Sequence, residues 1–500
     1  MLANVKAMIV VVVIATAVFI IAKPLCLRFI AEDDFARRRN VWFALTLTAF
    51  LSPSFWLYVL VALPVVAWSA RRDTNPLALY VLVMQVIPPI NIEIPMAAIN
   101  LFELNNFRIL AFAILIPAAW SLMQSKNKTG SGGLATMDVL IVAFVCLQLV
   151  LFMPTGSITN TMRSGFLSTL DVLLLYFVVS RACIKRRVIV ETMASFCLAS
   201  AIFAPLALFE SLWGWLLYEG IGIQWGSPLQ FAYAVRSGIL RAQVSTGHAL
   251  ALGNMMAIAF GFWLYLRSRV HSMPLTVAGV MWMWMGLLAA YSRGPWLAGA
   301  VIFFAFLAAG PNASGRFFKA ATISALIAGV VLVSPIGARI IDNLPFVGTV
   351  DAQNVIYRQR LVEISWELIW QNPYFGSPFV VDNLEALRQG QGIIDLLNVF
   401  LTVALFYGLV GLALFVGFFL VGTWNAYQRA RRSVGRDPDL SLLGASLVAC
   451  MCGLLLMMAT GGYGPGVTTL SYVVAGLATG YARLELDKAP AATESRVSST

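Results

Sequence analysis

Long apolar runs without charges recur along the whole chain and limit what it can fold into. The runs are about 15 to 25 residues long, and short segments that hold most of the charges separate them. A helix of that length crosses a hydrocarbon layer about 30 Å thick. Of the 500 residues, 60% are hydrophobic and 11% are charged, whereas soluble domains carry about 25% charged residues. The sequence excludes a soluble protein and predicts an all-α fold, a polytopic integral membrane helix bundle.

The apolar runs predict about fifteen helical segments, of which about 12 to 15 are expected to be transmembrane. The first run, 8–25, resembles a signal peptide, but it lacks a clean small-x-small cleavage pattern and is interpreted as an uncleaved span. The run 41–70 is interrupted by Ser52-Pro53-Ser54 and has basic residues at both ends, which favours a hairpin over one long tilted helix. The run 76–92 predicts a further span.

Basic residues collect in alternate loops and set the expected orientation. Clusters such as 185–187 and 429–436 mark cytoplasmic loops by the positive-inside rule. The formal net charge of +11 is attributed to these loops, so nucleic acid is not expected as a partner.

Two loops on the opposite side, 209–246 and 336–396, are long enough to carry structure of their own. In the second loop, apolar residues recur at helical spacing over 358–371 until Asn372-Pro373 ends the pattern. We expect this segment to be an amphipathic helix lying over the bundle.

Lysine and arginine are divided between the two sides of the predicted bundle. All seven lysines lie at the N-terminus or in loops expected to be cytoplasmic, whereas the outer loops carry arginine alone. The outer arginines are Arg108, Arg163, Arg236, Arg241, Arg293, Arg339, Arg358, Arg360 and Arg388. Because the guanidinium group is planar, permanently charged and bidentate, such a cluster indicates an anionic ligand such as a diphosphate. The alternative is that each arginine pairs with an outer acidic residue, as exposed ion pairs commonly do.

Arg293 stands apart because it lies between two long apolar spans with no loop to carry it into water. An ionisable group at such a position is costly and is functional by default. Snorkelling of its side chain to the outer interface is the alternative.

Few residues could act as a base. His248 and Asp395 each lie where a span begins, and either could take a proton from a hydroxyl group. The alternatives are an interfacial hydrogen bond for the histidine and a helix cap for the aspartate. Asp171 could serve a proton pathway or pair with Arg163, eight residues earlier. No clustered Cys/His set and no phosphate-binding loop are present, so neither a metal nor a cofactor is expected.

Several short motifs on the outer side occur in a recognisable order. They are Arg241 ahead of Gly247-His248, Ser292-Arg293-Gly294-Pro295-Trp296-Leu297, Arg358 fifteen residues before Pro373-Tyr374-Phe375-Gly376, and Asn398-Val399-Phe400-Leu401 leading to Gly408-Leu409-Val410-Gly411-Leu412. Over roughly residues 200–425 the chain resembles the O-antigen ligase and polymerase superfamily, bacterial inner-membrane enzymes that join lipid-linked glycans on the periplasmic side. Ligases of this superfamily show His-Asn where this chain has Leu397-Asn398. The pattern is therefore more similar to the exopolysaccharide polymerase branch, with Asp395 as the nearest substitute for the histidine.

The resemblance implies a metal-independent, inverting glycosyl transfer. The donor would be an undecaprenyl-diphosphate-linked glycan, and the acceptor would be a hydroxyl group of another lipid-linked repeat unit. The expected diphosphate-binding residues are Arg241, Arg293, Arg358, Arg236 and Arg360. Asp395 or His248 would orient or deprotonate the acceptor, and Asn398 and Tyr291 would lie beside it.

Two other functions stay open at this point. One is a ligase that attaches finished glycan to lipid A core or to protein, and the other is a membrane transporter or flippase. Whether a chain-length regulator protein binds beside the bundle is also open.

Three regions are expected along the chain. Residues 1–200 would form N-terminal transmembrane helices, and residues 201–483 would form the membrane region that carries catalysis. The polar stretch 484–500, rich in Ala, Ser, Thr and Glu, would be a disordered cytoplasmic tail.

Overall fold

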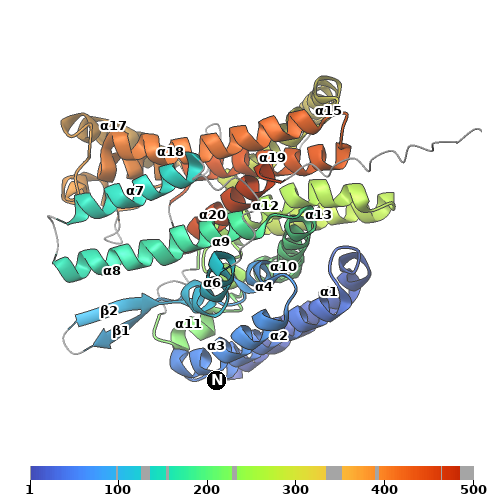
Figure 1. The fold of residues 1–500 in the computed structure, drawn as a ribbon, viewed down its shortest axis with the longest axis horizontal. Helices are drawn as coiled ribbons and strands as arrows, with labels where there is room; N and C mark the ends of the chain where they lie inside the picture. The colour runs from blue at the N-terminus through green and yellow to red at the C-terminus, as the bar shows by residue number, and fades with distance from the viewer. Residues whose placement is uncertain are drawn as a thin grey trace, which may run out of the picture.

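The fold is a stack of long helices that cross one another at shallow angles (Figure 1). The computed structural model describes residues 2–96, 99–124, 136–153, 157–227, 233–333, 352–388, 394–462 and 464–484. Eight of the described helices are long and apolar enough to cross a membrane, and α7, α13 and α14 are shorter apolar helices. The predicted all-α polytopic membrane bundle is confirmed. Arg339 and the tail beyond residue 484 lie outside the described residues, and the boundaries of the three regions stay predictions.

The first helices form one side of the bundle. They are α1 (Leu2–Cys26), α2 (Glu32–Leu51), α3 (Phe55–Arg72), α4 (Pro76–Val83), α5 (Asn106–Leu110), the π-helical segment η1 (Ala111–Leu115) and α6 (Ile116–Gln124). Helices α2 and α3 pack against each other. The chain reverses at Ser52-Pro53-Ser54, where the Ser54 side chain caps α3 by accepting from the Leu57 amide. The favoured hairpin is therefore confirmed.

The expected span 76–92 is wrong. Helix α4 ends at Val83, and the buried residues that follow are not helical. Pro88 and Pro89 explain this because proline lacks the amide that a helix needs and clashes with the preceding turn. The chain then forms an antiparallel hairpin of β1 (Ile92–Met96) and β2 (Ile99–Leu104).

The middle of the chain contains a second π-helical segment. The elements are α7 (Thr136–Phe152), α8 (Ile158–Ser168), η2 (Thr169–Leu174), α9 (Leu175–Ala182), α10 (Arg186–Trp213), α11 (Glu219–Gln224), β3 (Val235–Arg236), β4 (Ile239–Leu240) and η4 (Val244–Thr246). Asp171 in η2 pairs with Arg108 at 2.7 Å. The sequence suggested Arg163 as one partner for Asp171, whereas the structure shows Arg108, because the fold brings α5 beside η2, a contact that sequence spacing does not show.

The remaining helices form the other half. They are α12 (Ala249–Leu266), η5 (Arg267–Arg269), α13 (Met273–Ala289), α14 (Arg293–Ala309), α15 (Ala313–Val333), α17 (Ala352–Gln371), η6 (Val380–Leu387), α18 (Val399–Ser433), α19 (Pro438–Thr460) and α20 (Pro465–Ala482). The expected cytoplasmic loop 429–436 is helical as far as Ser433. Its Arg and Ala residues favour a helix, which ends before Gly435 at a φ of 84°.

The amphipathic helix expected over 358–371 is present as α17, which begins earlier, at Ala352. Leu361 and Ile369 pack with Leu405 of α18 in a separate small core, whereas Trp366 and Trp370 are exposed. The helix therefore lies on the surface of the bundle, as predicted.

A kink in α18 allows this helix to form hydrogen bonds with the segment that follows α17. Gly408 adopts a left-handed φ of 64°, and the break lets the amides of Leu409 and Val410 donate to the carbonyls of Pro373 and Tyr374 at 2.7 and 3.2 Å. A Cβ atom at Gly408 would collide with the Tyr374 backbone. Glycine is required here, and the contact fixes α17 against the start of α18.

Candidate functional site

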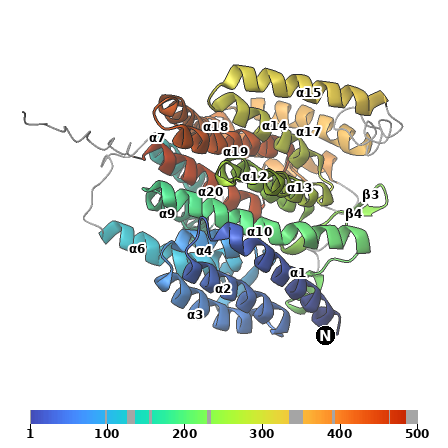
Figure 2. The same cartoon turned by 90° about the vertical axis from the view of Figure 1, so that its right-hand side faces the viewer.

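One pocket gathers most of the residues that the sequence singled out. It lies among the β3–β4 hairpin, the starts of α12 and α14, helix α17 and the segment before α18, and its volume is about 610 Å³. Figure 2 shows α10 running toward β3 and β4 at this end of the molecule. We call it the arginine pocket, and the predicted site residues that line it are Arg236, Arg241, His248, Arg293, Arg358 and Asp395.

Three predicted site residues lie outside this lining. The carbonyl of Tyr291 accepts a hydrogen bond from Arg236 at 3.1 Å, so this residue orients an arginine through its backbone. Asn398 caps α18 by accepting from the amides of Phe400 and Leu401 at 2.9 and 3.2 Å. Arg360 is exposed on α17 and is not among the pocket residues.

The turn between α13 and α14 holds Arg293 at the pocket. Helix α14 begins at Arg293, and Tyr291 adopts a left-handed φ of 46° to reverse the chain. The Trp296 indole donates to the Leu287 carbonyl at 2.9 Å and ties the two helices together. The first turn of a helix has unbonded amide N–H groups and the positive end of the helix dipole. The start of α14, at Arg293, therefore also favours an anion.

Glu210 holds the loop that carries Arg241. Its fully buried carboxylate accepts from the amides of Leu217, Gln243 and Val244 at 2.9, 2.9 and 2.8 Å. These bonds fix the chain between Arg241 and His248. Glu210 is one of the outer acidic residues covered by the ion-pair alternative, but these three bonds come from backbone amides and not from an arginine.

Sequence reasoning did not recognise the role of Glu210. One signal was available: it is the only charged residue between Glu191 and Glu219, at the end of a long apolar run. A charged group at such a place needs a specific set of partners.

His248 is placed to donate a hydrogen bond. It is the residue before α12, and its Nδ1 accepts from the Leu250 amide at 3.1 Å. Although the imidazole is accessible from the pocket, the surrounding protein atoms and then the charge of Arg241 lower its pKa to about 4. The ring is therefore neutral near pH 7, which leaves Nε2–H as a donor and makes the ring a weak base.

Asp395 is held by α17. The Tyr357 hydroxyl donates to the Asp395 carbonyl at 3.0 Å and accepts from its amide at 3.1 Å. Burial raises the pKa of the Asp395 carboxyl, and the positive charge of Arg358 partly opposes this shift. A carboxylate with a raised pKa is a better proton acceptor than an ordinary one, so Asp395 fits the role of base more closely than His248.

Arg358 lies within electrostatic reach of Arg236 and Arg293. Burial lowers the pKa of Arg358, and the charges of Arg236 and Arg293 lower it further, whereas Asp395 raises it. The Arg358 Nη2 donates to the Thr460 carbonyl at 3.2 Å, which directs the side chain into the pocket wall. Four arginines and two acids, Glu363 and Asp395, give the lining a formal charge of +2 with His248 neutral. The pocket therefore favours an anion with more than one negative charge.

Two other outer arginines follow the ion-pair alternative. Arg108 pairs with Asp171 at 2.7 Å, and Arg388 pairs with Glu385. Arg163 lies on α8, away from the arginine pocket lining. Within the part of the chain that the structure describes, no three His, Cys, Asp or Glu side chains gather as metal ligands would.

Comparison with protein families gives a match in the second half of the chain. Residues 278–416 match the family model described as O-antigen ligase. The matched segment includes Arg293, Arg358, Asp395 and the kink in α18, and it leaves Arg241 and His248 outside. No curated protein matches the chain.

Proposed function

Since the match of residues 278–416 to the O-antigen ligase model supports membership of the O-antigen ligase and polymerase superfamily, we propose that the chain is a polysaccharide polymerase. The family match supports a multi-pass membrane glycosyltransferase-type enzyme of O-antigen processing that acts on lipid-linked oligosaccharides. In the proposal, the enzyme transfers a glycan from undecaprenyl diphosphate to a hydroxyl group of another lipid-linked repeat unit. The observation that carries it is the arginine pocket, whose lining brings four arginines and Asp395 together.

The reaction is a direct displacement at the anomeric carbon of the donor sugar. The acceptor oxygen forms a bond to this carbon while the bond to the diphosphate oxygen breaks, and the electron pair of the broken bond leaves with the diphosphate. The proton of the acceptor hydroxyl passes to the Asp395 carboxylate and from there to water. Attack from the side opposite the leaving group inverts the anomeric configuration.

The arginines stabilise the leaving group. Arg293, Arg241 and Arg358 would hold the diphosphate oxygens through charge-assisted hydrogen bonds, and Arg236 adds a fourth positive charge. These groups are already in place before the negative charge grows, which is the basis of electrostatic catalysis. His248 would donate from Nε2 to a substrate oxygen. In this mechanism the leaving group is neutralised by arginine, so we expect activity without an added metal ion.

The charge distribution supports an active site on the periplasmic face of the bacterial inner membrane. Helix α10 begins next to Lys185 and reaches Glu210 beside the pocket loop, so Lys185 lies at the opposite end of the bundle. Lys319 follows α14, which starts at the pocket and runs away from it. Lys6 is the exception, because Asn4 contacts Gln224 of the outer loop. Lys185 and Lys319 thus lie on the side away from the pocket, as the positive-inside rule predicts for a periplasmic pocket.

A ligase is the second candidate, and the description of the matched family favours it. The two functions differ in the acceptor, which for a ligase is lipid A core or protein. A strain without a ligase still builds long lipid-linked glycans, whereas a strain without a polymerase holds single repeat units. A chain-length regulator as a partner stays a hypothesis from the resemblance alone.

A transporter or flippase is the third candidate. The Arg108–Asp171 pair is a charge pair within the apolar helices, of the kind that a transport pathway uses. The family match supports an enzyme instead.

The proposal is tested by Arg293→Ala in the native host. We expect the variant to remain in the membrane at the normal level while single repeat units accumulate and polymer is lost. Polymer of normal length in that variant would contradict the mechanism. Loss of the glycan attached to lipid A core or protein, while long lipid-linked glycan is still made, would favour the ligase.

A further inference from the structure

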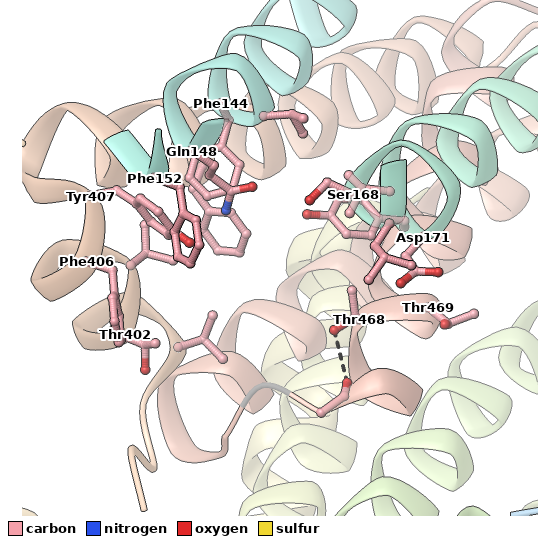
Figure 3. Close-up of a pocket in the computed structure, with 18 of the residues that line it drawn as sticks. Phe144, Gln148, Phe152, Ser168, Asp171, Thr402, Phe406, Tyr407, Thr468 and Thr469 are labelled. Atoms are coloured by element: carbon pink, nitrogen blue, oxygen red, sulfur yellow. Dashed lines mark hydrogen bonds between the residues drawn. The ribbon is translucent and has the colours of Figure 1, made fainter. Parts of the chain in front are cut away.

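A second cavity lies on the other side of the segment that carries Asp395. It has a volume of about 570 Å³ and is enclosed by α7, η2, β2, the start of α18 and the start of α20 (Figure 3). Leu397 lines the arginine pocket, and Val399 lines this cavity. Likewise, Thr460 lines the arginine pocket, and Gly464 lines this cavity. The two cavities are therefore separated by two short pieces of chain.

Aromatic and polar side chains face each other across this cavity, which we call the aromatic pocket. Figure 3 shows the rings of α7 and α18 together with Gln148 on one side, and Ser168 and Asp171 on the other. Thr468 and Thr469 lie below the open space. The labelled rings are Phe144, Phe152, Phe406 and Tyr407.

Asp171 is held in place by an ion pair. The Arg108 Nη2 and Nε donate to its carboxylate at 2.7 and 3.2 Å. The Asp171 side chain keeps 32% of its surface exposed, whereas Arg108 keeps 9%. The carboxylate lies in the π-helical segment η2, and Arg108 lies in α5, three residues before η1 begins at Ala111. Such π-helical insertions occur frequently at functional sites, and here they orient an acceptor toward the cavity.

The charge of the aromatic pocket excludes a second diphosphate site. The lining contains one arginine, Arg108, and two acidic residues, Glu103 and Asp171, so it carries a formal charge of −1. The arginine pocket carries +2 on the same count. The lining of the aromatic pocket therefore disfavours an anionic ligand.

A sugar ring combines the two features that this lining offers. A pyranose presents flat C–H faces that pack on aromatic rings, and its hydroxyl groups bond to carboxylate, amide and hydroxyl side chains. A volume of about 570 Å³ lies in the range of small-molecule sites, about 300–1,000 Å³. A prenyl or acyl chain would gain nothing from Asp171, Gln148 or Thr402.

We infer that the aromatic pocket binds a neutral pyranose unit of the acceptor glycan and directs its hydroxyl group toward Asp395. The chain geometry supports the direction of approach, since Gly462 stands between Thr460 of the arginine pocket and Gly464 of the aromatic pocket, and a Cβ atom at Gly462 would be 3.7 Å from the Asp395 Oδ1. The donor diphosphate then occupies the arginine pocket on the far side. This inference rests on the proposed function, because it assigns the second substrate of the same reaction.

Photo-crosslinking in the native host tests the ligand class directly. The crosslinking residue p-benzoylphenylalanine is incorporated at Phe406 of the full chain, and irradiated protein is treated with mild acid, which cleaves the sugar–diphosphate bond. A matched control carries the same residue at Trp424, which is exposed near the other end of α18. The adduct is then identified by mass spectrometry of the peptides.

We expect a sugar-bearing adduct at Phe406 that is several-fold more abundant than at Trp424. Phe152→Ala and Gln148→Ala, both on α7, should each reduce it several-fold while leaving the protein in the membrane. An adduct that carries a prenyl or acyl chain would overturn the inference, and so would a yield no greater than that at Trp424.

The test separates this inference from the proposed function. Crosslinking reports binding and does not need transfer, so the adduct should also form in Arg293→Ala. Polymer that is made normally without a sugar adduct would overturn the inference and leave the polymerase intact. A sugar adduct in a chain that joins no glycans would overturn the polymerase and leave the sugar site.

Discussion

The arginine pocket and the aromatic pocket are similar in size and opposite in chemistry. Their volumes are about 610 and 570 Å³, and their linings carry formal charges of +2 and −1. One is surrounded by guanidinium groups and the other by aromatic rings, although the same segment before α18 borders both. The comparison teaches that one short segment can separate a site for a charged leaving group from a site for a neutral acceptor. Asp395 lines the arginine pocket, and in our proposal the two substrates meet at its carboxylate.

The largest effect is expected from Arg293→Ala. Loss of one preorganised charge stabiliser costs about 10²–10³ in rate, so polymer formation by the purified protein should fall by that factor. Arg360→Ala is the matched control, because Arg360 is exposed on α17 outside the pocket lining. Its initial rate should stay near that of the native protein. Equal losses in the two variants would show that general surface charge, rather than the arginine pocket, binds the donor.

Asp395→Asn should lower the rate by about 10², the usual contribution of a general base. The native enzyme needs the Asp395 carboxylate, so its rate should fall as pH drops through the pKa of this group. Burial raises that pKa, and the fall should therefore occur above the pH at which an ordinary aspartate titrates. The pH–rate profile of the native enzyme and the variant checks this. An identical acid limb in both would remove Asp395 from the role of base.

Glu210→Ala should reduce the rate by about tenfold through the loop that carries Arg241, and it should destabilise the protein. Each buried amide left without an acceptor costs about 1–3 kcal/mol, and Glu210 serves three. The affinity for a soluble diphosphate and the thermal unfolding temperature should fall together. A normal diphosphate affinity would show that the loop does not depend on Glu210.

Phe152→Ala sharpens the comparison from the acceptor side. An aromatic contact contributes about 0.5–1.5 kcal/mol, so the KM for the lipid-linked repeat should rise by up to about tenfold while diphosphate affinity is unchanged. In Arg293→Ala we expect the reverse: the affinity for diphosphate should fall, and the KM for the lipid-linked repeat as acceptor should be unchanged. A parallel loss of diphosphate affinity would mean that the pockets are not separate.

The smallest effect is expected from His248→Gln, which keeps a hydrogen-bond donor. The pKa of His248 is lowered to about 4, so the native ring is already neutral above about pH 5. The rate should fall only a few-fold, and the shape of the pH–rate profile above about pH 5 should not change. A lost inflection near neutral pH would show that the histidine titrates during catalysis.

Much of the fold could be predicted from the sequence because a membrane span is a local feature. Length and apolarity alone mark α10 and α19, and the break at Ser52-Pro53 marks the hairpin. The error at 76–92 arose because apolarity was weighed above Pro88 and Pro89, which end a helix whatever surrounds them.

The site could be predicted only in part because its residues are distant in sequence. Motifs identified Arg241, Arg293, Arg358 and Asp395, but only the packing of α12, α14 and α17 places them in one pocket. Residues two apart on a helix do not share a face, so Arg358 and Arg360 could have been separated by spacing alone. The Arg108–Asp171 pair depends on π-helical segments that no sequence pattern indicated.

Reconstitution tests the central claim most directly. The purified protein is placed in lipid vesicles with an undecaprenyl-diphosphate-linked repeat unit and a chelator, without nucleotide, and the products are separated on a gel. The polymerase mechanism predicts a ladder of longer glycans with the native protein and with Arg360→Ala, and single units with Arg293→Ala. Single units from the native protein with its authentic repeat would contradict it, as would a ladder from Arg293→Ala.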